Sequence, residues 1–592
     1  EAQRMTDLNR QSVTAIADAV SAGRTTALAV AEDTLARIEA YDAIQPQIWI
    51  GKVAREDVLE AARKVDARIA AGERLPLAGV AYAVKDNIDV AGLETTAACP
   101  AFAYAPDQSA GVIERLEAAG AICVGKSNLD QFATGLVGVR SPYGIPRNVY
   151  NRDYVSGGSS SGSSVAVAAG LVPFALGTDT AGSGRVPAAF QHLIGFKPTK
   201  GRWSTRGLVP ACRSIDCITV FTDSIADARR VDESIAAFDA HDPWSKPLAD
   251  AALTPRRIGV PRPDQRVFFG DTQAEYLYDR ALAALSQSAE IVEIDIEPLL
   301  EAAQLLYGGP WVAERTAAVE ALLKSDPDAI DPTVRGIVEA GLDMKAVDLW
   351  NGIYRLAELK RHADGLWDGI DMLAFPTTGT TYRVRELQAS PVALNSNLGR
   401  YTNFVNLLDM AAIAVPAGQR GNGTGVGITL IGPADTDRAL MDAAETYLDA
   451  ADLPALPPLD MEDTMERVKL AVVGAHLKDM PLHWQLTSRD ATFVGAFETA
   501  PNYRLYAIAN STPPKPALVH SADGAAIKVE VYELDMEAFG SFTAEVPAPL
   551  AIGTVTLSDG SSVKGFVSEP RATEGAEDIT HLGEWRAFIA GS

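Results

Sequence analysis

Residues 155–170 read VSGGSSSGSSVAVAAG, a run of glycine and serine that leads directly into small apolar residues. Gly/Ser runs are usually flexible linkers, but a linker should be followed by polar spacer. Here the chain continues as LVPFALGTDTAGSGR (171–185), an apolar segment that ends in a second Gly/Ser cluster. The run therefore belongs to a domain core. A strand that ends at Gly177 would open into a loop of backbone N–H groups around Ser183, as an oxyanion hole requires.

The sequence around this run alternates between short apolar segments and helical segments. GVAYAV precedes Lys85, and it is followed in turn by GVIERLEAAG (111–120), AICVG (121–125), SSVAVAAG (163–170) and PFALG (173–177). Such alternation is typical of a layered α/β fold. Upstream, residues 10–72 are expected to be mostly helical, with one apolar face formed by Leu28, Ala31, Leu35 and Ile38.

Composition excludes several classes of protein. The chain has 592 residues, 47% of them apolar, and a net charge of −25, which disfavours binding to nucleic acid or to an anionic membrane. Its four cysteines form no C-x-x-C pair, which favours a reducing compartment. The N-terminal residues lack a signal-peptide pattern, and the apolar run 165–177 is too short to span a bilayer. We therefore expect a cytoplasmic protein that acts on a small molecule.

The C-terminal part of the chain differs in pattern. The stretch ADLPALPPLD (451–460) is rich in proline and precedes a change of composition. After it, residues 527–534 alternate between apolar and polar side chains, and residues 555–561 contain an Asp-Gly turn that predicts a hairpin. We predict a larger α/β domain over 1–450, a linker over 451–467, and a small β-rich domain over 468–592.

Three blocks of the larger domain resemble the amidase signature family in their order. They are AVKDNIDVAG (83–92), GGSSSGSS (157–164) and GTDTAGSGRVPAAF (177–190), and Ser159 and Ser183 are 24 residues apart, as that family's motif requires. The resemblance covers about residues 20–440. It implies the amidase signature fold, in which helices cover both sides of a mixed β-sheet.

The resemblance also implies the roles of individual residues in a Ser-Ser-Lys triad. Ser183 would be the acylated nucleophile, Ser159 the bridging serine with a cis peptide bond, and Lys85 the terminal base. The oxyanion hole would be formed by the backbone N–H groups of Thr180, Ala181, Gly182 and Ser183. This chemistry is physically reasonable because burial can lower the pKa of a lysine until its neutral amine accepts a proton.

Other polar residues near these blocks are interpreted as structural. Lys126 is a second candidate for the catalytic lysine, but the sequence around it is typical of a supporting loop. Asp179 and Arg185 are expected to form a partly buried ion pair that braces the nucleophile loop. A rival hypothesis is a serine esterase that uses Ser160 in a G-x-S-x-G elbow. Three histidines precede the linker: His192, His241 and His362. None of them lies in a recognisable catalytic block, which weakens the esterase hypothesis.

The substrate is predicted from two further likenesses. The loop around Ser183 and the C-terminal extension look like those of allophanate hydrolases, a branch of the family that hydrolyses urea-1-carboxylate to ammonia and N-carboxycarbamate. The segment 307–315, YGGPWVAER, resembles the part of those enzymes that holds the substrate carboxylate. Tyr307 and Arg315 would then bind this anion, since a guanidinium fork matches a carboxylate. Gly135 is expected to leave room for a flat substrate on the opposite wall.

The tail resembles the C-terminal domain of allophanate hydrolases, which is similar in fold to γ-glutamyl cyclotransferases. This implies a second site that decarboxylates N-carboxycarbamate, with His476 as the first candidate and His483 and Trp484 as weaker ones. A docking or dimerising role without chemistry is the alternative.

Three function classes therefore stay open at this point: an allophanate-hydrolysing amidase or an amidase of another small amide, a serine esterase, and a non-catalytic binding protein. We expect no metal and no cofactor. The resemblance implies a homodimer and functional coupling to a biotin-dependent urea carboxylase.

Overall fold

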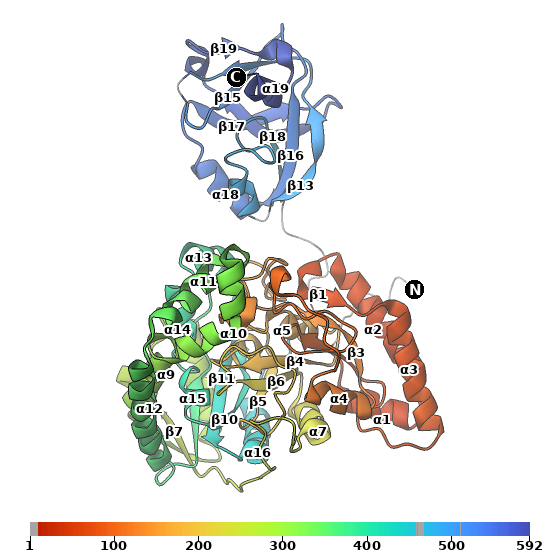
Figure 1. Cartoon of the computed structure of the whole chain (residues 1–592), viewed down its shortest axis with the longest axis vertical. Coiled ribbons are helices and arrows are strands. Elements are labelled where there is room, and N and C mark those ends of the chain that lie inside the picture. Colours follow the sequence, from red (N-terminus) through yellow and green to blue (C-terminus); the bar gives the residue numbers. More distant parts are fainter. Residues whose placement is uncertain (1–9, 458, 460–466, 490, 510, 592) are drawn as a thin grey trace. The chain divides into compact units, whose positions relative to one another are not determined.

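The strand that carries Lys85, β2 (Ala81–Lys85), belongs to a large mixed sheet. Figure 1 shows most strands of this sheet. The structure is a computed structural model that describes residues 10–457, 459, 467–489, 491–509 and 511–591. The chain divides into two compact units, residues 1–461 and 462–592. The predicted linker, 451–467, contains this division. Its residues 458 and 460–466 lie outside the described residues, and residue 451 still belongs to a helix.

The sheet of the larger unit has eleven strands in the order β1-β3-β2-β4-β6-β5-β10-β11-β9-β7-β8. β2 pairs in parallel with β3 and β4, whereas β4 and β5 are both antiparallel to β6. The strands are β1 Trp49–Lys52, β2 Ala81–Lys85, β3 Ile122–Ser127, β4 Phe174–Asp179, β5 Ile194–Lys197, β6 Cys217–Thr222, β7 Arg257–Pro261, β8 Glu290–Ile294, β9 Met372–Pro376, β10 Met410–Gln419 and β11 Gly425–Pro433.

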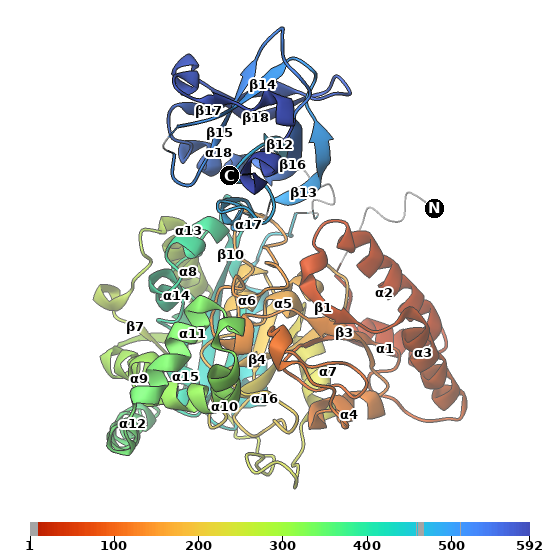
Figure 2. The same ribbon diagram turned by 45° about the horizontal axis from the view of Figure 1, so that its top comes forward.

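Helices lie on both faces of this sheet, as Figure 2 shows from a second direction. The helices are α1 Val13–Ser21, α2 Ala27–Asp42, α3 Arg55–Ala70, α4 Gly111–Ala118, α5 Ser161–Ala168, α6 Val186–Phe190, α7 Ile225–Ile235, α8 Thr272–Leu285, α9 Glu297–Gly308, α10 Trp311–Ser325, α11 Pro332–Glu339, α12 Ala346–Leu366, α13 Val384–Ala389, α14 Ala393–Leu398, α15 Phe404–Leu407 and α16 Asp437–Ala451. The predicted helices over residues 10–72 are confirmed, with β1 as an unpredicted strand between α2 and α3.

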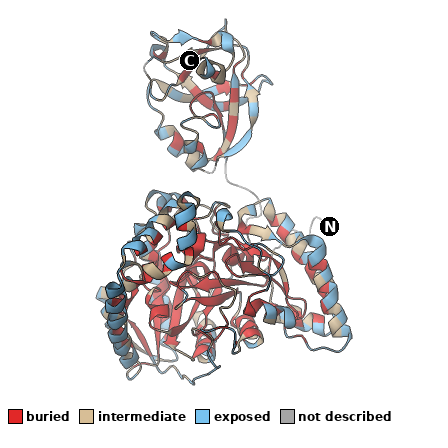
Figure 3. Cartoon of the chain, viewed as in Figure 1, coloured by how far each residue is buried: buried red, intermediate tan, exposed pale blue. Residues whose placement is uncertain are grey.

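Strand β2 shows why the sheet is buried on both faces. Its alternate side chains enter two different cores: Tyr82 and Val84 pack with α4 and α7, whereas Ala81 and Ala83 pack with α2 and α5. Every residue of β2 and β4 is buried, and Figure 3 shows the strands as the buried interior of the unit. The predicted fold class, a mixed sheet covered by helices on both sides, is confirmed.

The smaller unit is rich in β-structure, as predicted. Its five-stranded sheet has the order β13-β16-β12-β18-β17, and a second sheet has the order β15-β14-β19. The elements are β12 Arg467–Val472, α17 Trp484–Thr487, β13 Thr492–Glu498, β14 Tyr503–Ala507, β15 Pro516–His520, β16 Lys528–Asp535, α18 Met536–Ala544, β17 Leu550–Thr556, β18 Ser562–Ser568, β19 Glu577–Asp578 and α19 Trp585–Ala590. The predicted hairpin is β17 and β18, with Gly560 at φ +84° in the connection.

Two further observations concern the described residues only. None of their helices combines the length and the apolar character that crossing a bilayer requires. All four cysteines are free, and three of them are buried.

Candidate active site

Lys85 is the last residue of β2 and is fully buried. Its Nζ donates hydrogen bonds to Ser159 Oγ at 2.7 Å, to Ser160 Oγ at 3.0 Å and to Thr178 Oγ1 at 2.7 Å. Thr178 comes from the adjacent parallel strand β4, and both serines precede α5. These three hydroxyls form a cage around the amine, and no carboxylate among the described residues lies within 4.0 Å of Nζ.

The buried position of Lys85 allows it to act as a base. Burial lowers the pKa of Lys85 from 10.5 to about 7, although the carboxylates of Asp130, Asp216 and Asp179 act in the opposite direction. A substantial fraction of the amine is therefore neutral near pH 7. A neutral amine can accept a proton through a hydroxyl neighbour.

The loop that carries Ser159 is fitted closely to its surroundings. The Gly158–Ser159 peptide bond is cis, the conformation that the family resemblance implied. A Cβ atom at Gly158 would lie 2.2 Å from Asp130 Oδ2, so only glycine fits there. The Asp130 carboxylate is held by the backbone N–H groups of residues 137, 138 and 140 at 2.9–3.1 Å. Asp130 thus joins the loop before α5 to the loop that contains Gly135.

Ser183 lies in the loop between β4 and α6 and is buried. Its hydroxyl donates to the carbonyl oxygen of Gly135 at 3.4 Å. Across the described part of the chain, no hydrogen bond joins Ser183 to Ser159. The structure therefore brings Lys85 and Ser159 into direct contact, whereas Ser183 would have to rotate its hydroxyl away from Gly135 to complete a relay.

The nucleophile loop is braced by the predicted ion pair. Arg185 contacts both oxygens of Asp179 at 2.9 Å, and both side chains are fully buried rather than partly buried as expected. Burial would raise the pKa of Asp179, but Arg185 outweighs it and holds this pKa below its ordinary value. The same carboxylate accepts the backbone N–H groups of Gly182 at 2.9 Å and Gly184 at 3.1 Å.

This contact changes the predicted oxyanion hole. The Gly182 N–H is already used by Asp179, so it does not offer a free donor as the resemblance implied. Within the described residues, the N–H groups of Thr180, Ala181 and Ser183 have no such acceptor. Three of the four expected donors are thus unoccupied.

Asp216 is a buried carboxylate behind this loop that sequence reasoning missed. It accepts hydrogen bonds from the Thr180 hydroxyl and from the backbone N–H of Ala211 at 2.8 Å. Burial raises the pKa of Asp216 from 3.8 to about 6, although these hydrogen bonds lower it. Asp216 fixes the side chain of Thr180, and it precedes β6, whose pairing with β4 brings the two segments together.

Arg315 and Tyr307 come together as predicted from segment 307–315. Arg315, on α10, donates to Tyr307 Oη at 3.4 Å and to Thr134 Oγ1 at 3.1 Å, and its guanidinium carbon lies 4.9 Å from the centre of the Tyr307 ring. Arg315 is only 2% exposed, and its Nε has no partner. No carboxylate of the described residues lies within 4.0 Å of this guanidinium. A buried cation without a counter-ion is energetically costly, and an anion placed beside it would reduce that cost.

Gly135 lies beside the nucleophile, but its missing side chain has a different reason from the expected one. A Cβ atom there would lie 2.7 Å from Asp130 Oδ2, at a φ of +152°. The space is therefore filled by the Asp130 carboxylate and not kept for a substrate. The Gly135 carbonyl oxygen is the group that faces Ser183.

The residues assigned structural roles are placed accordingly. Lys126 is buried, pairs with Asp86 at 3.0 Å and donates to Thr95 Oγ1 at 3.0 Å. Ser160 accepts from Lys85 and donates to the Thr178 carbonyl, and none of the described histidines contacts it. Burial lowers the pKa of His192 to about 3, which leaves it neutral. The geometry gives no support to the esterase hypothesis.

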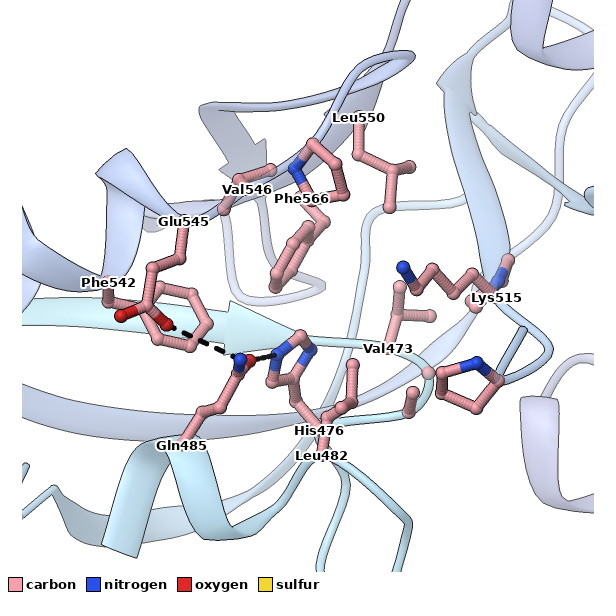
Figure 4. Close-up of a pocket in the computed structure, with 15 residues that line it drawn as sticks. Val473, His476, Leu482, Gln485, Lys515, Phe542, Glu545, Val546, Leu550 and Phe566 are labelled. Atoms are coloured by element: carbon pink, nitrogen blue, oxygen red, sulfur yellow. Dashed lines mark hydrogen bonds between the residues drawn. The ribbon is translucent and has the colours of Figure 1, made fainter. Parts of the chain in front are cut away.

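The smaller unit contains a separate cavity of about 160 Å³ that His476 lines (Figure 4). His476 Nε2 lies 2.7 Å from Gln485 Oε1, and the His476 ring stacks on Phe566 with centroids 5.0 Å apart. Gln485 in turn donates to Glu545 at 3.4 Å. Burial lowers the pKa of His476 below its ordinary value, although its hydrogen bond to Gln485 raises it.

Lys515 also lines this cavity and was not predicted. Its ammonium points into the cavity in Figure 4, and no described carboxylate lies within 4.0 Å of it. The weaker candidates lie elsewhere: His483 and Trp484 are not among the lining residues, and Trp484 is 57% exposed.

The comparisons with known proteins agree with this architecture. The amidase family model matches residues 30–441, and the model of the allophanate hydrolase C-terminal domain matches residues 468–590. The urea amidolyase of Saccharomyces cerevisiae is 44% identical over 569 residues, which cover 91% of this chain and 31% of that protein. The chain thus spans about a third of the length of this relative.

Relatives and structures of similar length also match. A glutamyl-tRNA(Gln) amidotransferase subunit of Symbiobacterium thermophilum is 34% identical over 72% of this chain and 94% of its own length. The structure of Kluyveromyces lactis allophanate hydrolase matches 98% of this chain and 99% of its own at 41% identity and a TM-score of 0.71. The peptide amidase of Stenotrophomonas maltophilia covers 76% of this chain and 99% of its own at 25% identity and a TM-score of 0.65. This chain belongs to the amidase family, and its residues 468–590 match the allophanate hydrolase C-terminal domain.

Proposed function

We propose that this amidohydrolase hydrolyses allophanate with Ser183 as nucleophile, Ser159 as proton relay and Lys85 as base. Ser183 Oγ attacks the terminal amide carbon of the substrate while its proton passes to Ser159, whose own proton passes to Lys85. The N–H groups of Thr180, Ala181 and Ser183 stabilise the negative oxygen that forms. Lys85 then returns the proton through Ser159 to the leaving nitrogen, and ammonia departs.

Deacylation uses the same groups in reverse. A water molecule loses a proton through Ser159 to Lys85 as it attacks the acyl-enzyme, and Ser183 recovers a proton when the C–O bond breaks. The product is N-carboxycarbamate. The hydroxyl of Ser183 leaves the Gly135 carbonyl and turns to Ser159 for each attack.

The observation that carries the choice of allophanate is the buried guanidinium of Arg315, which has no counter-ion. Allophanate is a carboxylated urea, and its carboxylate would supply the missing charge. Tyr307 lies against the same guanidinium and can donate its hydroxyl to the same anion. A neutral amide would leave Arg315 buried and unpaired, which disfavours it as a substrate.

The test is the selectivity of an Arg315→Ala variant. It should lose roughly 2–5 kcal/mol of transition-state binding for allophanate, the range for truncating one partner of a buried charge pair, and much less for small neutral amides. Arg315→Lys should recover part of the loss, since an ammonium cannot form the bidentate fork. Arg335→Ala, on α11, is the control for removing an arginine that pairs with a surface carboxylate. Equal losses on charged and neutral amides would reject the assignment.

A second function is proposed for the cavity of the smaller unit, because it holds His476 and a lysine without a described carboxylate partner. Lys515 would bind one carboxylate of N-carboxycarbamate, and His476 would protonate the nitrogen as the C–N bond to the other carboxylate breaks. The dianion and one proton then give carbamate and carbon dioxide, and carbamate decays to ammonia and carbon dioxide. The apolar wall that includes Phe566 favours release of the neutral gas.

This function is tested by following both products of one reaction. His476→Ala should leave the first ammonia unchanged and delay carbon dioxide, because the second site acts after the amidase step. His520→Ala is the matched control, since His520 is exposed and lies on β15 outside the cavity. Identical carbon dioxide time courses for wild type and His476→Ala would mean that the smaller unit performs no chemistry.

Partners and location follow as proposals from the same likenesses. Because the yeast relatives are about three times longer and are named urea amidolyases, we expect this chain to work with a biotin-dependent urea carboxylase that supplies allophanate. We also expect a homodimer. Four free cysteines suit the reducing conditions of the cytoplasm.

A further inference from the structure

A pocket of about 500 Å³ opens between α9 and the segment 395–403 of the larger unit. Its lining includes Tyr307 and Gln304 from α9, and Asn395, Arg400 and Asn403 from the other side. Of the residues that line this pocket, only Tyr307 has a role in the mechanism proposed above.

Three of the lining residues connect the pocket to three parts of the catalytic site. Tyr307 contacts the guanidinium of Arg315. Asn395 Oδ1 accepts the backbone N–H of Leu136 at 2.8 Å, next to the carbonyl that faces Ser183. Asn403, with its amide in the orientation that its neighbours require, donates to the Ala181 carbonyl at 2.8 Å. The pocket therefore borders the active site at three places.

Arg400 is the only charged residue among those that line this pocket. It is half-buried, its Nε is buried without a partner, and its guanidinium carbon lies 5.7 Å from the centre of the Tyr401 ring. Among the described carboxylates, none lies within 4.0 Å of its guanidinium. The pocket thus presents a positive charge that no acidic neighbour neutralises.

The charge of the whole chain makes this local charge relevant. At a net charge of −25, the protein repels a small anion at long range. A pocket lined by a single cation reverses that repulsion locally and concentrates an anion at its mouth. Tyr307, in the lining of the pocket, contacts Arg315, whose guanidinium also has no described carboxylate within 4.0 Å.

We propose that this pocket is the route by which an anionic substrate reaches Ser183, and that Arg400 is the residue that captures the anion at its mouth. The inference rests on the proposed hydrolysis of allophanate. Arg400 does not touch the reacting atoms. Its effect therefore falls on capture of the substrate and not on the chemical step.

The experiment measures kcat and KM for allophanate in an Arg400→Gln variant at two ionic strengths. At about 0.01 M the Debye length is about 30 Å, and we expect kcat/KM to fall by about 3- to 30-fold with most of the loss in KM. At about 1 M the Debye length is about 3 Å, and the loss should shrink to less than about twofold. Arg400→Lys should keep both the rate and its salt dependence, because the charge remains.

The control is Arg24→Gln, which removes one exposed positive charge from the turn between α1 and α2, outside the pocket. It should leave both parameters near the wild-type values. A loss in Arg400→Gln that is equal at both ionic strengths, or no loss at all, would overturn the inference. Ammonia release from allophanate by the wild-type chain tests the proposed function separately. The role of Arg400 is judged from the ratio of kcat/KM between each variant and the wild type.

Discussion

The pH dependence of the amidase reaction follows from the hydroxyl cage around Lys85. Its pKa of about 7 leaves about half of the amine neutral at pH 7, about a tenth at pH 6 and about a hundredth at pH 5. The base is the neutral amine, so activity is present above pH 7 and is lost as the pH falls through this value. We expect kcat/KM for allophanate to fall about tenfold for each pH unit below 7.

A second group titrates close to the same window. The pKa of Asp216 is about 6, so this carboxylate takes up a proton as the pH falls below 6. Its negative charge also raises the pKa of Lys85, which means that Asp216→Asn should lower that pKa. If the lysine controls the reaction, the acid limb persists in this variant and moves to lower pH.

The assay is ammonia release from allophanate between pH 5 and 9, at constant ionic strength. Lys85→Arg provides the permanently charged control and should be inactive throughout, because its guanidinium does not deprotonate. Loss of the acid limb in Asp216→Asn would refute control by Lys85, since the carboxylate would then be the controlling group. A flat wild-type profile from pH 5 to 7 would refute it as well.

Three further predictions concern the same unit. Ser183→Ala should abolish ammonia release while the melting temperature stays within a few degrees of wild type, and appreciable turnover would exclude Ser183 as nucleophile. Arg185→Met should destabilise the larger unit by about 3–5 kcal/mol, measured by calorimetry, because it leaves Asp179 buried and unpaired; an unchanged transition would contradict the bracing role. Replacing three histidines together, His192, His241 and His362, should leave amide hydrolysis intact in a folded protein. Loss of hydrolysis in this variant would revive the esterase hypothesis.

The fold could be predicted because the strands carry a strong local signal. β2 and β4 are short apolar runs between helical segments, and the blocks that contain Lys85 and Ser183 begin in the last residues of these strands. The family resemblance then implied how these blocks come together. Strand β4 nevertheless continues two residues beyond the predicted end at Gly177, since Thr178 and Asp179 pair with β6.

The details of the site depended on contacts between distant segments, which local patterns do not contain. Thr178 faces Lys85 because β2 and β4 are neighbouring strands. The local sequence of each strand does not reveal which strands pair. Asp216 reaches Thr180 from 36 residues away. The Asp179 carboxylate accepts the Gly182 N–H, and the Asp130 carboxylate fills the space beside Gly135. The directions in which these two side chains point could not be predicted from their positions in the sequence.

The cage around Lys85 has a consequence for the energetics of each turnover. Three hydroxyls occupy the positions that water molecules would take around an ammonium in solution, so they act as a fixed hydration shell inside the buried core. Unlike a carboxylate, a hydroxyl both accepts and donates, so it can turn toward the neutral amine as easily as it accepts from the cation. The shell therefore serves both charge states of the lysine by rotating hydrogens alone. Proton exchange on Lys85 therefore needs no movement of the backbone, and serine and threonine suit these positions better than any acidic residue.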